Sequence, residues 1–252
     1  MKLAAKKTIK NNKPQYSLFD IQMSVGENEF EKGYKLYEND KVGNITSDWR
    51  GFNAEVKGTH DYFVSVSTND FERGSCDCYL GQKDILCKHM IALAIATVLK
   101  YDPKDKKIER GSFDYALCSG DVRDVTKEEL SGIRKEIRSA LKYVKSYSGP
   151  SREWFAYQDS LLKGRRLALY SLSKLPVCKS SVDFCIYLIK KLDDKLVNSG
   201  IDDSDGTVGG LIEQIMELLS LFVSFDNSLK KYTIEKFPKK TNFDWEKELF
   251  VI

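Results

Sequence analysis

Residues 75–93, S-C-D-C-Y-L-G-Q-K-D-I-L-C-K-H-M-I-A-L, decide the fold of the N-terminal part of the chain. Two pairs of metal-binding side chains lie within them, eight residues apart: Cys76 with Cys78, and Cys87 with His89. Residues i and i+2 of a β-strand point to the same side, so the first pair can face one ion. A loop with Gly81 at its bend brings the chain back to the second pair, at the start of an apolar helix. We therefore expect a tetrahedral site of three cysteines and one histidine.

Zinc is the metal that these side chains favour. Thiolate and imidazole groups are borderline-soft ligands that suit Zn²⁺, and four protein ligands leave no position for water or substrate. We therefore expect one structural Zn²⁺. The free N–H groups at the start of the following helix, with Lys88 beside them, favour the negative charge of the thiolates. The chain's other histidine, His60, falls in a predicted turn and is expected to be solvated.

The composition is that of a globular protein, which excludes disordered and fibrous classes. The 252 residues include 40 Lys+Arg and 37 Asp+Glu, a net charge of +3, and 42% are hydrophobic. The longest apolar stretch, residues 90–99, is about half of the roughly 20 residues that span a bilayer, so we expect no membrane span. Lysines near the N-terminus interrupt any apolar signal segment, and we expect a cytoplasmic protein, in which clustered cysteines indicate metal binding or catalysis.

The hydrophobic period changes near residues 101–124 and divides the chain. We expect four parts: a basic N-terminal arm (1–25), a zinc domain (26–102), a linker (103–124) and an α-helical domain (125–252). In the zinc domain apolar residues mostly alternate, as in half-buried strands. There we predict a helix, three short strands and a second helix, over residues 28–37, 42–45, 52–56, 62–66 and 90–99.

Four amphipathic helices are predicted in the C-terminal half. The first opens at Thr126, which forms a capping box with Glu129. Its apolar seam comprises Leu130, Ile133, Ile137, Leu141 and Val144. The others begin with Ser151 as N-cap, near Ser180 or Ser181, and after residues 202–206. Each must bury one stripe, most simply in antiparallel pairs. The predicted fold is therefore α+β: a small antiparallel sheet with a zinc module, followed by an all-α tail.

The spacing Cys-x-Cys, eight residues, Cys-x-His resembles the SWIM zinc finger. The similarity extends to F-E-K-G-Y-K-L-Y-E-N-D-K-V, to A-E-V-K-G and Y-F-V-S-V, and to C-K-H-M-I-A-L, over about residues 30–99. The resemblance implies a ββα zinc module with Cys76, Cys78, Cys87 and His89 as ligands. It also implies a binder of nucleic acid or protein, found beside helicase-like ATPases, recombination factors and transposases. Tyr79 stands where many relatives have proline.

No catalytic motif accompanies the zinc ligands. The sequence lacks a phosphate-binding GxxxxGK[ST] loop, a GxSxG elbow, an HExxH helix and the zinc-deaminase pattern. The acidic run at 202–206 does not fit the calcium-loop register, because Ile201 and Ile212 would occupy its first and last ligand positions. We therefore expect a protein that binds rather than catalyses.

Two binding functions remain open. Residues 20–111 carry thirteen basic and sixteen acidic side chains, a net charge of −3, which favours a protein-interaction adaptor or accessory subunit. The resemblance to SWIM proteins implies an ATPase or a DNA-processing system as the partner. The alternative is a nucleic-acid binder, in which basic and aromatic side chains contact phosphates and bases. Its candidate residues are Lys6, Lys7, Lys10, Trp49, Arg50, Lys83 and Lys88. The partner's identity and the oligomeric state stay open.

Overall fold

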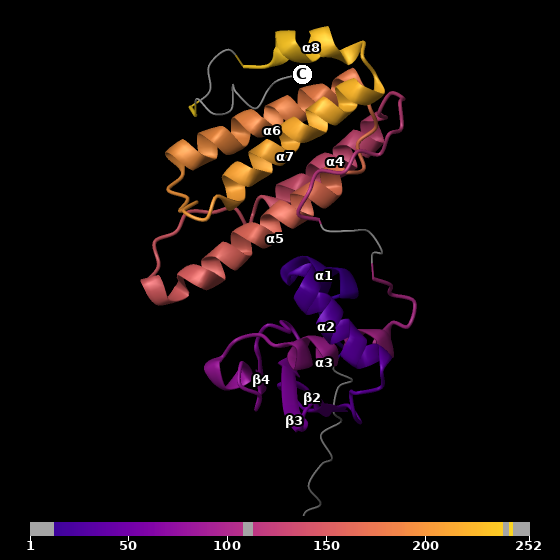
Figure 1. Ribbon diagram of the computed structural model, residues 1–252, viewed down its shortest axis with the longest axis vertical. Coiled ribbons are helices and arrows are strands. Elements are labelled where there is room, and N and C mark those ends of the chain that lie inside the picture. Colours follow the sequence, from indigo (N-terminus) through magenta and orange to yellow (C-terminus); the bar gives the residue numbers. More distant parts are fainter. Residues whose placement is uncertain (1–12, 108–112, 239–241, 244–252) are drawn as a thin grey trace, which may run out of the picture. The chain divides into compact units, whose positions relative to one another are not determined.

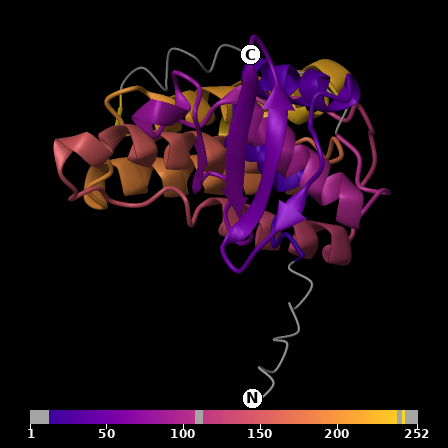
Figure 2. The same ribbon diagram turned by 90° about the horizontal axis from the view of Figure 1, so that it is seen from below.

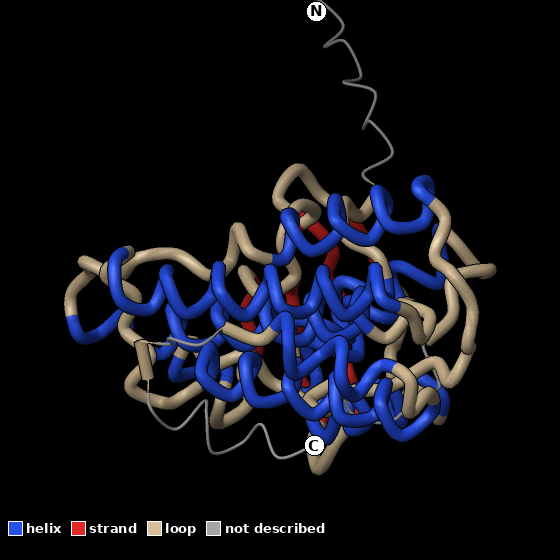
Figure 3. Tube along the Cα trace, turned by 90° about the horizontal axis from the view of Figure 1, so that it is seen from above, coloured by secondary structure: helices blue, strands red, loops and turns tan. Residues whose placement is uncertain are grey.

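The computed structural model describes residues 13–107, 113–238 and 242–243, which belong to two compact units (Figure 1). The units are Met1–Arg110 and Gly111–Ile252, so their boundary falls inside the predicted linker. All described strands belong to the first unit, and the regular structure described in the second is helical (Figure 3). The predicted α+β fold is confirmed.

A four-stranded antiparallel sheet, in the order β1-β2-β3-β4, forms one layer of the first unit. Its strands are β1 (Thr46–Ser47), β2 (Gly51–Lys57), β3 (Asp61–Ser67) and β4 (Gly74–Cys76). The long pair β2 and β3 dominates the sheet (Figure 2). Phe52, Ala54 and Val56 are buried on one face of β2, whereas Asn53 and Glu55 point to the other. The alternation of the sequence therefore gives both strands correctly.

The structure corrects the strand predicted at residues 42–45. The regular edge strand is β1, and the segment before it follows β2 with irregular pairing. The Lys57 N–H donates to the Lys41 carbonyl, and the Gly43 N–H donates to the Glu55 carbonyl, both at 2.8 Å. A Cβ at Gly43 would lie 3.0 Å from that Glu55 oxygen. Glycine at position 43 thus lets this segment lie close to β2. Their backbone groups form hydrogen bonds there without a continuous β-ladder.

Helix α3 (Lys88–Tyr101) is the central element of the first unit. Met90 and Leu93 pack with the apolar face of the sheet, whereas Ile91 and Ile95 belong to a second apolar cluster on the other side. This second cluster includes residues of α1 (Leu18–Ser24) and α2 (Glu27–Glu38). Helix α3 is therefore buried between the sheet and the two N-terminal helices (Figure 1).

Helix α1 falls in the segment predicted as a basic arm, residues 1–25. Ser17 and Asp20 form a capping box: the Ser17 hydroxyl accepts from the Asp20 N–H at 3.2 Å, and the Asp20 carboxylate accepts from the Ser17 N–H at 2.9 Å. Leu18 and Ile21 are fully buried. The predicted arm is therefore too long at its C-terminal end, and residues 1–12 lie outside the described chain.

The second unit is a bundle of four long helices with a short fifth helix. They are α4 (Lys127–Ala140), α5 (Trp154–Leu172), α6 (Lys179–Asn198), α7 (Thr207–Phe225) and α8 (Leu229–Lys236). Helix α4 packs on α5, α5 on α7 and α7 on α6, around one apolar core. The predicted apolar seam lies in this core or packs against it. A short 3₁₀ turn (Ser151–Glu153) precedes α5, so Ser151 is not its N-cap, and α8 was not predicted.

Helix α7 is long and apolar enough, by length and composition alone, to cross a membrane. It is a longer candidate for a membrane span than residues 90–99. Half of its most apolar window is buried inside the unit, and a core helix passes the same test. Leu211, Ile215 and Phe222 are fully buried in the core of the bundle, so packing within the unit accounts for its apolar character.

The capping box predicted at the start of α4 is confirmed. The Thr126 hydroxyl accepts from the Glu129 N–H at 3.1 Å, and the Glu129 carboxylate accepts from the Thr126 N–H at 2.9 Å. Arg123 donates to both oxygens of the same carboxylate, at 2.8 and 3.0 Å. The Arg123 guanidinium, followed by the Thr126 N–H, lowers the pKa of Glu129 to about 2.

Replacing Thr126 with alanine is expected to lower the free energy of unfolding of the second unit by about 1 kcal/mol, because the first turn of α4 loses its side-chain acceptor. Urea unfolding followed by circular dichroism measures the change. The control is Ser131→Ala, at an exposed position within α4, which should change stability by a few tenths of a kcal/mol at most. Equal losses in the two variants would contradict the capping role.

Candidate metal centre

The four predicted ligands come together where the sheet meets α3. Cys76 is the last residue of β4, Cys87 is the N-cap of α3, and His89 lies in the first turn of that helix. Cys78 lies in the turn beyond β4, so the strand argument does not account for its position. The Gly81 N–H donates to the Cys78 Sγ at 3.4 Å instead, and this turn directs the thiol back toward Cys76.

The spacing of the ligand atoms fits one tetrahedral ion. The three Sγ atoms and one histidine ring nitrogen lie within 4.8 Å of one another. His89 Nδ1 is 3.7 Å from Cys76 Sγ and 3.9 Å from Cys87 Sγ. Zn–S bonds of about 2.3 Å and Zn–N bonds of about 2.0–2.1 Å require sulfur–nitrogen separations of roughly 3.6 Å in a tetrahedron. The ligand set therefore fits Zn²⁺ with only small adjustments.

Burial explains why these thiols need a cation. All four ligand residues are buried. Burial raises the pKa of the Cys76 and Cys87 thiols above that of a free cysteine, because a thiolate loses its hydration there. Burial opposes ionisation of Cys78 too, but the Gly81 N–H, the thiols of Cys76 and Cys87 and the Leu80 N–H together outweigh it and lower the pKa of this thiol. A dication at the centre supplies the charge that stabilises all three thiolates.

The imidazole of His89 is positioned as a neutral ligand through Nδ1. Burial, followed by the charge of Lys88, lowers its pKa, which favours the neutral form that binds metals. The ring stacks on Tyr62, with centroids 4.3 Å apart and planes 28° apart. Its Nε2 is buried without a partner among the described residues. A Cβ at Gly58 would lie 3.1 Å from this atom, so glycine there allows the ring to sit close to the backbone.

Residues 62–97 match the family model of the SWIM zinc finger. This segment is a SWIM zinc finger. It contains the four ligands, β4 and most of β3 and α3, and it supports one structural Zn²⁺. Comparison with curated proteins and with solved structures finds no match. The family resemblance predicted from the sequence is therefore confirmed, and the four residues predicted as ligands form a cluster that fits one zinc ion.

Two residues that flank the SWIM ligands were not singled out from the sequence. Tyr62 provides the stacking surface for His89, and Gly58 provides the space beside it. The alternation of β3 could have identified the tyrosine, since Tyr62 shares the inward face with Val64 and Val66. The role of Gly58 depends on its closeness to the His89 ring in the folded chain, which the sequence does not show.

Tyr79, which departs from the proline of many SWIM relatives, points away from the ligands. Its side chain is exposed, and its hydroxyl accepts from Lys83 Nζ at 2.6 Å. Lys83 lies in the 3₁₀ turn η1 (Gly81–Lys83) within the zinc loop. The departure from proline therefore changes the surface of the loop and leaves the ligand positions intact.

The predicted nucleic-acid contacts do not form one cluster around the SWIM ligands. Trp49 and Arg50 lie in the turn between β1 and β2, with the guanidinium 4.8 Å from the ring centroid. Trp49 is 82% exposed. Lys88 is exposed at the first position of α3. Lys6, Lys7 and Lys10 lie outside the described residues.

Removal of zinc is expected to unfold the finger and spare the helical bundle. The metal supplies folding free energy of order 10 kcal/mol in zinc-finger peptides, whereas the bundle has an apolar core of its own. Elemental analysis should give one zinc per chain. After chelation, hydrogen exchange should lose protection over residues 60–100 and keep it in α4–α7. Full protection of residues 60–100 without metal would contradict a structural zinc.

Gly81→Ala is expected to weaken zinc binding at least tenfold. A Cβ at this position would lie 2.1 Å from the Cys76 carbonyl oxygen and 2.6 Å from the Cys76 Cβ, so the zinc loop must move away from a ligand. Competition with a chromogenic chelator measures the affinity. The control is Gly132→Ala on α4, where a Cβ meets nothing within 4 Å. An unchanged zinc affinity in Gly81→Ala would show that the close packing is not required.

Proposed function

We propose that this chain is a non-enzymatic, cytoplasmic adaptor or accessory subunit, whose SWIM finger binds a protein of an ATPase or DNA-processing system. The observation that carries the proposal is the closed ligand set: four buried protein ligands leave no coordination position for a substrate. The metal then stabilises a surface and takes no part in a reaction. Recognition by that surface is the function this arrangement supports best.

The surface of the zinc loop supports a protein ligand. Tyr79 is 71% exposed and Ile85 is 48% exposed, and Leu80 is also exposed between them. All three belong to the loop that joins Cys78 to Cys87, so the metal fixes the positions of both ends of this loop. Large apolar side chains held at a surface are typical of protein-interaction sites. Residues 77–88 carry two acidic and two basic side chains, which gives no attraction for a phosphate backbone.

A nucleic-acid ligand is the second candidate, and Trp49 with Arg50 is the observation that favours it. An exposed indole with a guanidinium over its ring offers stacking to a base and a cation to a phosphate. Asp48 lies beside the pair and accepts from the Arg50 N–H at 2.7 Å. The negative charge of this carboxylate weakens the attraction for phosphate, and this is why we place the nucleic-acid function second.

The experiment compares protein and nucleic-acid binding in the same zinc-loaded preparation. Affinity capture with quantitative mass spectrometry is expected to recover one specific protein, and the triple variant Tyr79→Ser, Leu80→Ser, Ile85→Ser should recover at least tenfold less of it. Phe63→Ser is the matched control, since Phe63 is an exposed apolar side chain on the opposite face of the sheet from α3. Capture should survive this change.

Nucleic-acid binding is measured by fluorescence anisotropy with single- and double-stranded DNA and RNA across a range of salt concentrations. The adaptor function predicts no micromolar affinity at physiological salt. A micromolar or tighter affinity that falls steeply with salt, and that Trp49→Ala with Arg50→Ala abolishes, would establish the second candidate in its place.

A further inference from the structure

A groove in the helical bundle lies between α4 and α6. It encloses about 310 Å³, which is at the lower end of the range of about 300–1,000 Å³ for ligand pockets. The lining side chains are Arg134, Ile137, Arg138, Leu141, Phe184, Tyr187, Leu188 and Lys191. None of them belongs to the zinc finger, and this inference does not depend on the proposed function.

The groove exists because the bundle is not closely packed on all sides. Helix α4 packs on α5, α5 on α7 and α7 on α6, but α4 and α6 are not a closely packed pair in the described chain. Both helices present a stripe with spacing i, i+3, i+4 and i+7 to the space between them. Seven residues of helix correspond to about 10 Å, so the groove is about two turns long.

The floor of the groove is apolar, and its rims are cationic and aromatic. Ile137, Leu141, Phe184 and Leu188 are buried at the floor. Arg134 and Arg138 form the rim on α4, and Tyr187 and Lys191 form the rim on α6. A ligand that fits must therefore combine large apolar side chains with negative charge.

The cations of the rims are available to a ligand. Arg134 lies over the ring of Phe184 at 5.5 Å, and Lys191 lies over the ring of Tyr187 at 6.0 Å. No ion pair with a carboxylate of the described residues involves Arg134, Arg138 or Lys191. Tyr187 is 56% exposed, although its ring stacks on Phe184. Two exposed arginines, a half-buried lysine and an exposed aromatic ring thus lie above an apolar floor.

A segment with the complementary chemistry occurs in the same chain. Residues 244–252, which lie outside the described part, read D-W-E-K-E-L-F-V-I. Their three acidic side chains match the three cations in number, and tryptophan, leucine and phenylalanine match the floor. We propose that the groove between α4 and α6 is the docking site for residues 244–252 of the same chain.

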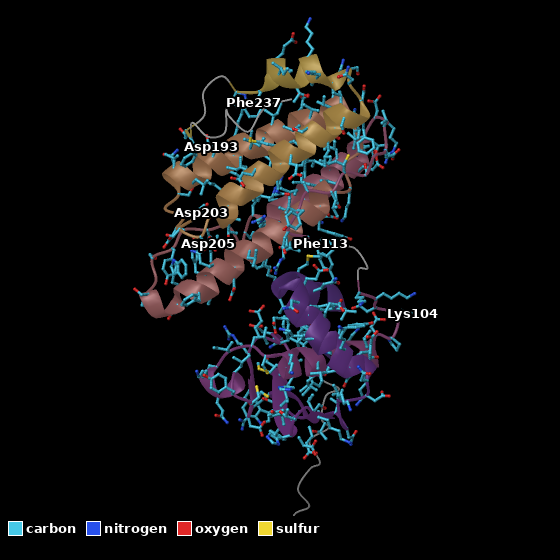
Figure 4. All side chains as sticks on the ribbon, viewed as in Figure 1. Lys104, Phe113, Asp193, Asp203, Asp205 and Phe237 are labelled. Atoms are coloured by element: carbon cyan, nitrogen blue, oxygen red, sulfur yellow. The ribbon has the colours of Figure 1, made fainter. Side chains whose placement is uncertain are left out.

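The described chain ends within reach of the groove. The Asn242 side chain donates to Asp193 on α6 at 2.7 Å, and Figure 4 labels Asp193 on this helix. Asp193 lies two residues from Lys191 but faces the other side of α6, so the segment must pass around the helix. Half the circumference of a helix about 10 Å across is about 16 Å. Nine extended residues span about 30 Å, so the first residues of the segment can cross α6 and about 14 Å, roughly the last four residues, remains to enter the groove.

Hydrogen exchange on the full chain tests the docking. Amides of residues 244–252 should exchange at least tenfold more slowly than in a free peptide of that sequence. Arg134→Glu with Arg138→Glu should remove this protection, whereas Lys127→Glu with Lys135→Glu, the same charge change on α4 outside the groove, should keep it. Combining the Arg134 and Arg138 changes with Glu246→Lys and Glu248→Lys should restore protection, since the charges are then exchanged.

Three results would overturn the proposal. The first is exchange at the free-peptide rate in the unaltered chain, and the second is equal protection in the groove variant and its control. The third is protection that rises with protein concentration together with a dimer in sedimentation, since the groove would then hold a second copy. The changes on α4 affect exposed side chains, and circular dichroism with zinc analysis confirms that each variant is folded.

Discussion

Four ligand atoms that lie within 4.8 Å of one another, at the junction of the sheet and α3, are the constraint on which the first unit depends. Three of them are sulfur atoms in an interior where burial disfavours thiolates, so the thiolate forms require a cation beside them. The sheet has two long strands and two short ones, and Cys76 and Cys78 lie at the end of a short strand and in the turn beyond it. The zinc therefore adds stability at the end of the sheet that the apolar clusters around α3 do not supply by themselves.

The two units are stabilised by different interactions. The zinc finger gains stability from metal binding and from α3, which contributes to apolar clusters on two sides. The helical unit relies on one large apolar core that includes residues from all five of its described helices. Its acidic loop before α7, which contains Asp203 and Asp205 (Figure 4), resembles a cation site but satisfies backbone donors instead: Asp203 accepts from the N–H groups of Val208 and Gly209.

The features of this structure that depend on local sequence patterns were predictable, whereas those that depend on tertiary packing were not. The spacing of Cys76, Cys78, Cys87 and His89 gives the zinc site, alternation gives β2 and β3, and the capping box gives the start of α4. Helix α1 is missed because seven residues after a lysine-rich segment carry a weak periodic pattern. The position of Cys78 depends on a turn, and the groove depends on which helices of the bundle pack closely, and neither is encoded in a local pattern.

The position of the zinc ligands on α3 has a consequence for how the sequence can change. Cys87 and His89 fix the rotation of the helix about its axis, while Leu93 must face the sheet and Ile95 the opposite layer. One residue inserted after His89 would turn everything beyond it by about 100°, which would move both apolar stripes away from the layers they pack against. The fold can therefore tolerate single substitutions in α3. Insertions and deletions between the ligands and Val98 would disrupt the packing on both sides of the helix.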